Sequence, residues 1–128
     1  MLFFTFRQNN SGGYLDIRPE EGIGSTVCIE ATDAEAANAK AREIGITFGM
    51  LGSCECCGER WMEVDEYDGM PFPHKYGHLI WTKDHRTEPS FIHYSNGTVV
   101  RVDPSDKAPQ GWQQVYAAYI IHHQRTVA

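Results

Sequence analysis

Three of the four cysteines lie in one short segment. Cys54, Cys56 and Cys57 fall within four residues, and the outer two form a C-x-x-C pair followed by Gly58. In zinc knuckles this spacing lets two thiolates hold one ion, while the glycine frees backbone amides to face the sulfurs. We therefore expect a zinc site in which Cys54, Cys56 and Cys57 are joined by His74.

A second C-x-x-C pair is absent from the sequence, so the fourth ligand stays open, with His78 and Cys28 as alternatives to His74. The patterns of a catalytic zinc are absent too. No histidine is followed two positions later by glutamate, as in zinc deaminases, and there is no H-E-x-x-H. A structural zinc is therefore favoured over a catalytic one, and reduced, metal-free thiols are the alternative.

Two histidine motifs offer a different chemistry. His85-Arg86-Thr87 and His93-Tyr94-Ser95 each match His-x-Thr/Ser. Phosphodiesterases of the two-histidine type use such imidazoles as acid and base. In an enzyme of this kind we would assign the catalytic roles to His85, His93 and Glu59, although the two motifs lie only eight residues apart.

The segment after the first apolar run has the composition of a ligand-binding turn. Glycines expose backbone amides, and asparagine and serine add donors, so such a loop can hold an anion or a nucleotide. An ordinary hairpin turn has the same composition. The candidate ligand-binding residues are Gln8, Asn9, Asn10, Ser11 and Gly12, with the aromatic ring of Trp61.

The charge excludes some partners. There are 11 basic and 17 acidic residues, a net charge of -6, whereas a generic nucleic-acid binder needs a basic surface. Residues 55–73 carry six acidic residues against one arginine, so the acidity is local. We read this run as a solvated loop or, more specifically, as a contact patch for a basic partner. No apolar run approaches the ~18 residues of a membrane span, and the first residues lack the features of a signal peptide.

The elements that must position these residues fit one α+β domain spanning residues 1–128, with a small, mostly antiparallel sheet and one packed helix. Period-two alternation and flanking turn residues predict three strands, at residues 2–7, 14–17 and 26–31. Thr32 and Glu35 form a capping box that begins a helix, which Gly45 ends.

The second half of the chain has weaker signals. Residues 50–74 read as a loop that a zinc ion would tether, and residues 79–82 as a short strand. Asn96-Gly97 predicts a hairpin over 91–102 with a two-residue loop, which pairs His93 with Val100. Residues 112–125 fit a helical stripe but are also rich in strand formers.

Three segments resemble a family of small uncharacterised proteins of tailed bacteriophages. They are FRQNNSGG at residues 6–13, EATDAEAANAKAREIGI at 30–46 and CECCGERW at 54–61. The resemblance covers about half of the chain and implies no activity. It implies a phage gene product that acts in the cytoplasm of a bacterial host.

These observations favour a non-enzymatic phage accessory protein that binds a host protein or a small signalling nucleotide and so counters host defence. Two alternatives stay open: a small zinc- or histidine-dependent phosphodiesterase acting on a nucleotide messenger, and a virion or assembly component. The first would show turnover, and the second a symmetric homo-oligomer.

Overall fold

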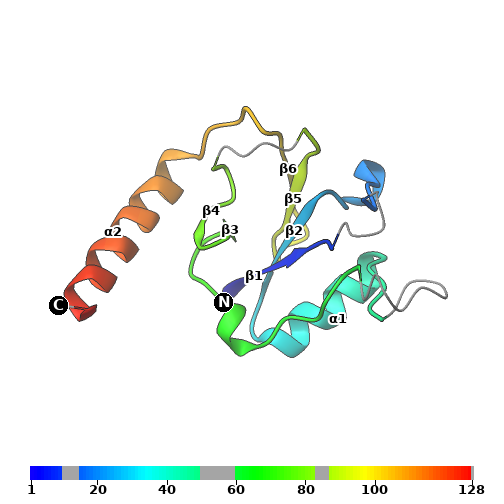
Figure 1. Cartoon of the computed structure of the whole chain (residues 1–128), viewed down its shortest axis with the longest axis horizontal. Coiled ribbons are helices and arrows are strands. Elements are labelled where there is room, and N and C mark those ends of the chain that lie inside the picture. The colour runs from blue at the N-terminus through cyan, green and yellow to red at the C-terminus, as the bar shows by residue number, and fades with distance from the viewer. Residues whose placement is uncertain (10–14, 50–59, 83–86, 128) are drawn as a thin grey trace.

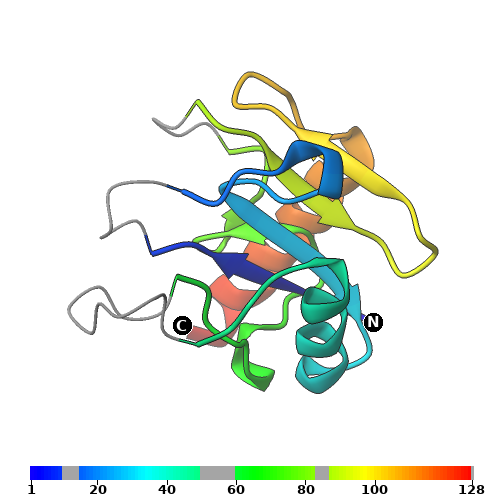
Figure 2. The same ribbon diagram turned by 90° about the vertical axis from the view of Figure 1, so that its right-hand side faces the viewer.

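The computed structural model describes residues 1–9, 15–49, 60–82 and 87–127. Four strands form one sheet in the order β1-β2-β5-β6, and two short strands, β3 and β4, form a second sheet. The helices α1 and α2 cover opposite faces of the larger sheet (Figures 1 and 2). The predicted α+β class is confirmed. The larger sheet is mixed, however, because β2 and β5 pair in parallel while its other two pairs are antiparallel.

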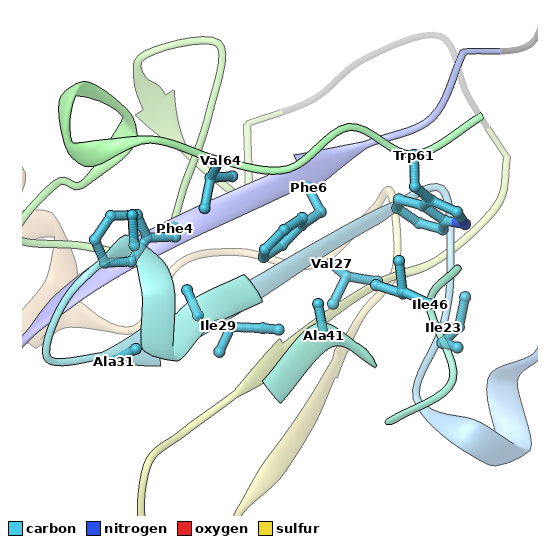
Figure 3. Packing of buried hydrophobic residues seen from close by; sticks show 12 residues of the cluster. Phe4, Phe6, Ile23, Val27, Ile29, Ala31, Ala41, Ile46, Trp61 and Val64 are labelled. Atoms are coloured by element: carbon cyan, nitrogen blue, oxygen red, sulfur yellow. The ribbon is translucent and has the colours of Figure 1, made fainter. Parts of the chain in front are cut away.

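Strands β1 (Leu2–Arg7) and β2 (Thr26–Ala31) confirm two of the three predicted strands. Alternation along β1 turns Phe4 and Phe6 toward α1 and Phe3 toward the opposite face. Both faces of the sheet are covered, which explains why almost every residue of β2 is buried. Figure 3 shows the larger core, in which Phe6 and Val27 pack with residues of α1 and with Trp61.

The third predicted strand, at residues 14–17, is wrong: the structure has no strand at residues 15–17. The antiparallel partner of β1 is β2, which is reached through a short 3-10 turn, η1 (Pro19–Glu21). The backbone of Asp16 is held by the side chain of Gln8 instead of by a neighbouring strand.

Helix α1 (Ala34–Ile44) confirms the predicted helix, but its cap is one residue later than expected. Asp33 is the N-cap, since its backbone is extended and its carboxylate accepts a hydrogen bond from the amide of Ala36 at 2.8 Å. The helix buries Ala34, Ala37 and Ala41 against the sheet. Gly45 ends it in the left-handed conformation, as predicted.

The hairpin of β5 (Ser90–His93) and β6 (Val99–Val102) forms in a register different from the predicted one. His93 pairs with Val99, not with Val100. Tyr94 donates to the carbonyl of Thr98 and accepts from the amide of Gly97, so the loop has three residues and ends in a left-handed glycine. This loop is the second common hairpin type, and it places Phe91 and His93 on the face of Val99.

The face of the larger sheet opposite α1 is covered by two elements. They are the hairpin of β3 (His74–Lys75) and β4 (His78–Leu79), and α2 (Gln110–Val127). The α2 helix settles the ambiguity of residues 112–125 and is a second helix where one was expected. Trp112 packs edge-on against Phe3 at 5.3 Å between ring centroids, and Tyr116 against Phe72 at 5.2 Å. In the described ranges, neither α1 nor α2 has both the length and the apolar character that crossing a bilayer requires.

Candidate functional site

The predicted ligand-binding turn is only partly within the described residues. Asn10, Ser11 and Gly12 lie outside them. Gln8 is buried, and its carboxamide is used within the fold: Nε2 donates to the carbonyls of Asp16 and Gly24, and Oε1 accepts from the Asp16 amide. The backbone of Asn9 donates to the carbonyl of Arg60 at 2.8 Å. Gln8 therefore positions the chain after β1 and does not present its side chain to a ligand.

Trp61, the aromatic residue assigned to the same site, belongs to the core. It is 2% exposed and packs in the cluster that α1 covers (Figure 3). Its indole N–H points to a carboxylate oxygen of Asp16 at 3.4 Å. The bidentate contact of Asp16 with Arg18 holds the pKa of this carboxyl below its usual value. The two faces of the indole are therefore not available for stacking on a base.

Of the predicted zinc ligands, Cys54, Cys56 and Cys57 lie outside the described residues. His74 is buried, and its Nε2 donates to the carbonyl of Phe3 at 3.0 Å, so ligation through this nitrogen requires that bond to break. The alternative ligand Cys28 lies in β2, where burial raises the pKa of its thiol to about 12. Within the described ranges, no three histidine, cysteine or acidic side chains group in a way that could hold a metal ion.

Of the three residues assigned to a phosphodiesterase, the structure describes only His93. His85 and Glu59 lie outside the described residues. His93 is buried on the inner face of β5, where Nε2 donates to the carbonyl of Gly22 at 2.7 Å. Burial holds the pKa of His93 below its usual value. An imidazole in this position is a core group that lines none of the described cavities.

The described part of the acidic run has local structural roles. Glu63 pairs with Arg42 of α1 at 2.8 Å, and Glu66 accepts from the first amide of α1, that of Ala34. Asp65 and Asp68 form a capping box around the 3-10 turn η3 (Glu66–Asp68). Carboxylates next to a helix N-terminus are stabilising. In the described part of this run, residues 60–73, acidic side chains therefore contact α1 both at its first residue and in its last turn.

A pocket that the sequence motifs did not indicate lies between β4 and the first turn of α2. Its volume is about 560 Å³, within the range of small-molecule sites. We call it the α2 pocket. It is lined by Leu79, Trp81, Thr82, Pro104, Ser105, Asp106, Lys107, Ala108 and Gln113.

The walls of the α2 pocket are held by short-range hydrogen bonds. Thr82 donates from its amide to the carbonyl of Leu79, which turns the chain after β4. Asp103 and Asp106 are joined by two bonds, one through backbone atoms and one to the Asp106 carboxylate. The Gln113 side chain donates to the carbonyl of Ala108 at 2.7 Å. These bonds place an indole ring, an ammonium group and several hydroxyl or carboxylate groups around one cavity.

The chemistry of the α2 pocket suits a ligand with a flat ring and a polar or anionic arm. Trp81 offers an aromatic wall, and Lys107 offers a positive charge next to the beginning of α2. The first amides of a helix have no intrahelical acceptor and favour an anion. The sequence shows Trp81 and, separately, a turn between Pro104 and Pro109 that contains Lys107. No sequence pattern indicates that these two segments lie on the same pocket.

Comparison with known proteins places the chain in a family. Residues 1–110 match the model of a family described as Domain of unknown function (DUF7296). The chain belongs to this family. The matched span contains both sheets and α1 and ends where α2 begins, so Gln113 of the α2 pocket lies beyond it. No curated protein and no solved structure matches the chain.

Proposed function

We propose that this protein is a non-enzymatic binding protein that holds a small nucleotide in the α2 pocket. The observation that carries the proposal is the pocket itself, with a volume of about 560 Å³ and with Trp81 and Lys107 in its lining. The base would stack on the indole of Trp81, and the phosphate would lie near Lys107 and the first turn of α2. Ser105 and Asp106 offer groups that can bond a ribose hydroxyl.

Binding without turnover is the form of the proposal that the described side chains favour. His93, the one described histidine of the expected catalytic pair, is committed to the carbonyl of Gly22. The lining of the α2 pocket contains no histidine or cysteine, in a part of the chain that the structure describes. Asp106 is the one acidic residue of the lining, and its carboxylate already accepts from the amide of Asp103.

The biological setting of the proposal rests on the resemblance to tailed-phage proteins. In that setting the protein acts in the cytoplasm of an infected bacterium, where withdrawal of a signalling nucleotide would blunt a host response. A structural zinc held by Cys54, Cys56 and Cys57 also stays a prediction, since these residues lie outside the described ranges.

Native mass spectrometry of untagged protein, purified gently from an expressing bacterium, tests the proposal. We expect a retained nucleotide mass that is lost in Trp81→Ala and in Lys107→Ala. The matched control is Lys40→Ala, because Lys40 lies on α1, its side chain is 41% exposed, and it pairs only weakly with Glu43 at 3.6 Å. A retained host protein in place of a nucleotide would reject this form of the proposal. Absence of a bound mass would also reject it if the ribonucleoside monophosphates did not raise the melting temperature.

A further inference from the structure

A second, smaller cavity lies at the free edge of β1. Its volume is about 200 Å³, the size of one heteroaromatic ring system, and we call it the β1-edge cavity. It is lined by Thr5, Arg7, Tyr67, Asp68, Met70, His74, Tyr76 and Gly77. It shares no residue with the α2 pocket, and nothing in the proposed function depends on it.

Backbone groups of β1 face this edge. Strand β1 is the outer strand of its sheet, and alternate residues turn their N–H and C=O groups away from β2. Phe3 is one of them, since it exchanges two hydrogen bonds with Met70. By the same alternation Thr5 and Arg7 also face outward. The Thr5 hydroxyl donates to the carbonyl of His74 at 2.6 Å, but in the described ranges no backbone–backbone hydrogen bond beyond those of the sheet uses the backbone groups of Thr5 or the N–H of Arg7.

The open part of the edge is too short for another strand. One bridge, Phe3 with Met70, closes it at one end, and a second bridge, Gln8 with Trp61, closes it at the other. Only Thr5 and Arg7 face outward between these bridges. The carbonyl of one residue and the N–H of the residue two positions later form an acceptor and donor pair that one planar group can match. A single ring fits this gap, whereas a peptide strand does not.

Two exposed tyrosine rings border the cavity. Tyr67 is 97% exposed and stands on the η3 turn, which its capping box fixes. Tyr76 is 62% exposed, and the guanidinium of Arg7 lies 4.3 Å from its ring centroid. Tyrosine rings exposed to this degree give up few contacts within the protein when they stack on a ligand, and stacking on their flat faces adds to the binding free energy.

Tyr76 also occupies a position that its residue type does not favour. It joins β3 to β4 with Gly77, and both residues have positive φ, of 53° and 81°. Such turns prefer asparagine or glycine at the first of these positions. The ring is therefore held at the cavity at a cost in backbone energy, in agreement with a use outside the core.

From these observations we infer that the β1-edge cavity binds the base of an adenine nucleoside. The exocyclic amine of adenine would donate to the carbonyl of Thr5, and the neighbouring ring nitrogen would accept from the N–H of Arg7. The tyrosine rings would stack on the base. Inosine has the same size and shape, but its carbonyl and ring N–H reverse the order of donor and acceptor, so the site would reject it.

Amide-resolved NMR titration with adenosine, which has no phosphate, tests the inference on the full chain. We expect the amide of Arg7 to shift and adenosine to bind at least tenfold more tightly than inosine. Tyr67→Ala and Tyr76→Asn should each lower the affinity of the protein for adenosine by about tenfold. Tyr76→Asn should at the same time raise the melting temperature, because it relieves the turn, so loss of folding cannot explain loss of binding.

The control for this titration is Lys107→Ala, because Lys107 lines the α2 pocket and not the β1-edge cavity, so adenosine binding should be unchanged. Equal binding of inosine, or full affinity in Tyr67→Ala and Tyr76→Asn, would overturn the inference. Adenosine shifts confined to amides around Trp81 would also overturn it while supporting the proposed function. The inference does not depend on the proposed function. If the α2 pocket retains no nucleotide, we still expect adenosine to shift the amide resonance of Arg7.

Discussion

The side chain of Gln8 and the backbone of Asp16 exchange two hydrogen bonds, both 2.7 Å long. Nε2 of Gln8 donates to the carbonyl of Asp16, and the amide of Asp16 donates to Oε1. The second proton of Nε2 goes to the carbonyl of Gly24 at 2.8 Å. One buried carboxamide therefore fastens the chain that leaves β1 to the chain that enters β2, as a neighbouring strand would.

Gln8→Glu should lower the free energy of unfolding by about 3 kcal/mol near neutral pH, since a carboxylate has no proton for either carbonyl and would be buried opposite both. Urea denaturation measures the change. Gln114→Glu is the matched control, because Gln114 is exposed on α2, and its effect should stay within about 0.5 kcal/mol. A loss below 1 kcal/mol in Gln8→Glu would show that the carboxamide does not hold these segments together.

The same side chain explains why the strand predicted at residues 14–17 does not form. Leu15 and Ile17 alternate as strand residues do, and this local pattern was the basis of the prediction. Whether such a segment pairs with β1 depends on the competition for the edge of β1. At the outer edge of β1, the bridges are instead formed by Met70 with Phe3 and by Trp61 with Gln8, and both partners are remote in sequence. A polar side chain that replaces a strand leaves no periodic signal.

The start of α1 allows a comparison of two adjacent residues. Sequence spacing assigned the cap to Thr32, whereas the carboxylate of Asp33 accepts from the amide of Ala36. We expect Asp33→Ala to cost about 1 kcal/mol of unfolding free energy, and Thr32→Ala, the control, to cost at most about 0.5 kcal/mol. Thermal and urea unfolding of the two variants measure this difference. The reverse order would restore Thr32 as the cap.

Gly97 of the hairpin loop and Gly111 of α2 are two glycines at which the same substitution to alanine should have opposite effects on stability. An added Cβ would meet nothing within 4 Å at Gly97 or at Gly111. Gly97 has a φ of 93°, so Gly97→Ala strains the backbone and should cost about 1 kcal/mol. Gly111 lies in the first turn of α2, where Gly111→Ala should stabilise the protein by up to about 0.5 kcal/mol. A Gly97→Ala variant that melts no lower than the wild-type protein would contradict the left-handed glycine of the three-residue loop.

The candidate sites were harder to foresee than the elements. The strand alternation of residues 2–7 and 26–31, the alanine spacing of α1 and the stripe in α2 are local signals, and these elements form. The alternation at residues 14–17 is equally local, and the strand it predicted does not form. The parallel pairing of β2 with β5 is not local, and it brings the hairpin of residues 90–102 beside the first half of the chain. The α2 pocket depends on that placement, because Trp81 and Lys107 come from turns on either side of it. Their sequence neighbours carry no periodicity that would predict their meeting.

We expect two buried histidines to make the free energy of unfolding depend on pH near neutrality. Burial lowers the pKa of His93 and of His74 below the ordinary value near 6.5. As the pH falls through 6.5, the unfolded chain takes up protons that the folded chain does not. The unfolding free energy should therefore be highest above pH 7 and should decrease as the pH falls toward the lower pKa values of the folded state. Each histidine adds a slope of at most about 1.4 kcal/mol per pH unit.

Urea denaturation at pH 7.5, 6.5 and 5.5 measures this slope in a range where most carboxylates stay ionised. His93→Gln keeps a donor for the carbonyl of Gly22 but cannot take up a proton, so it should reduce the slope. His74→Gln should act in the same way through the carbonyl of Phe3. The exposed His122 is the matched control, and His122→Gln should leave the slope of the wild-type protein unchanged. A wild-type stability that is flat from pH 7.5 to 5.5 would mean that neither imidazole is held neutral by the core.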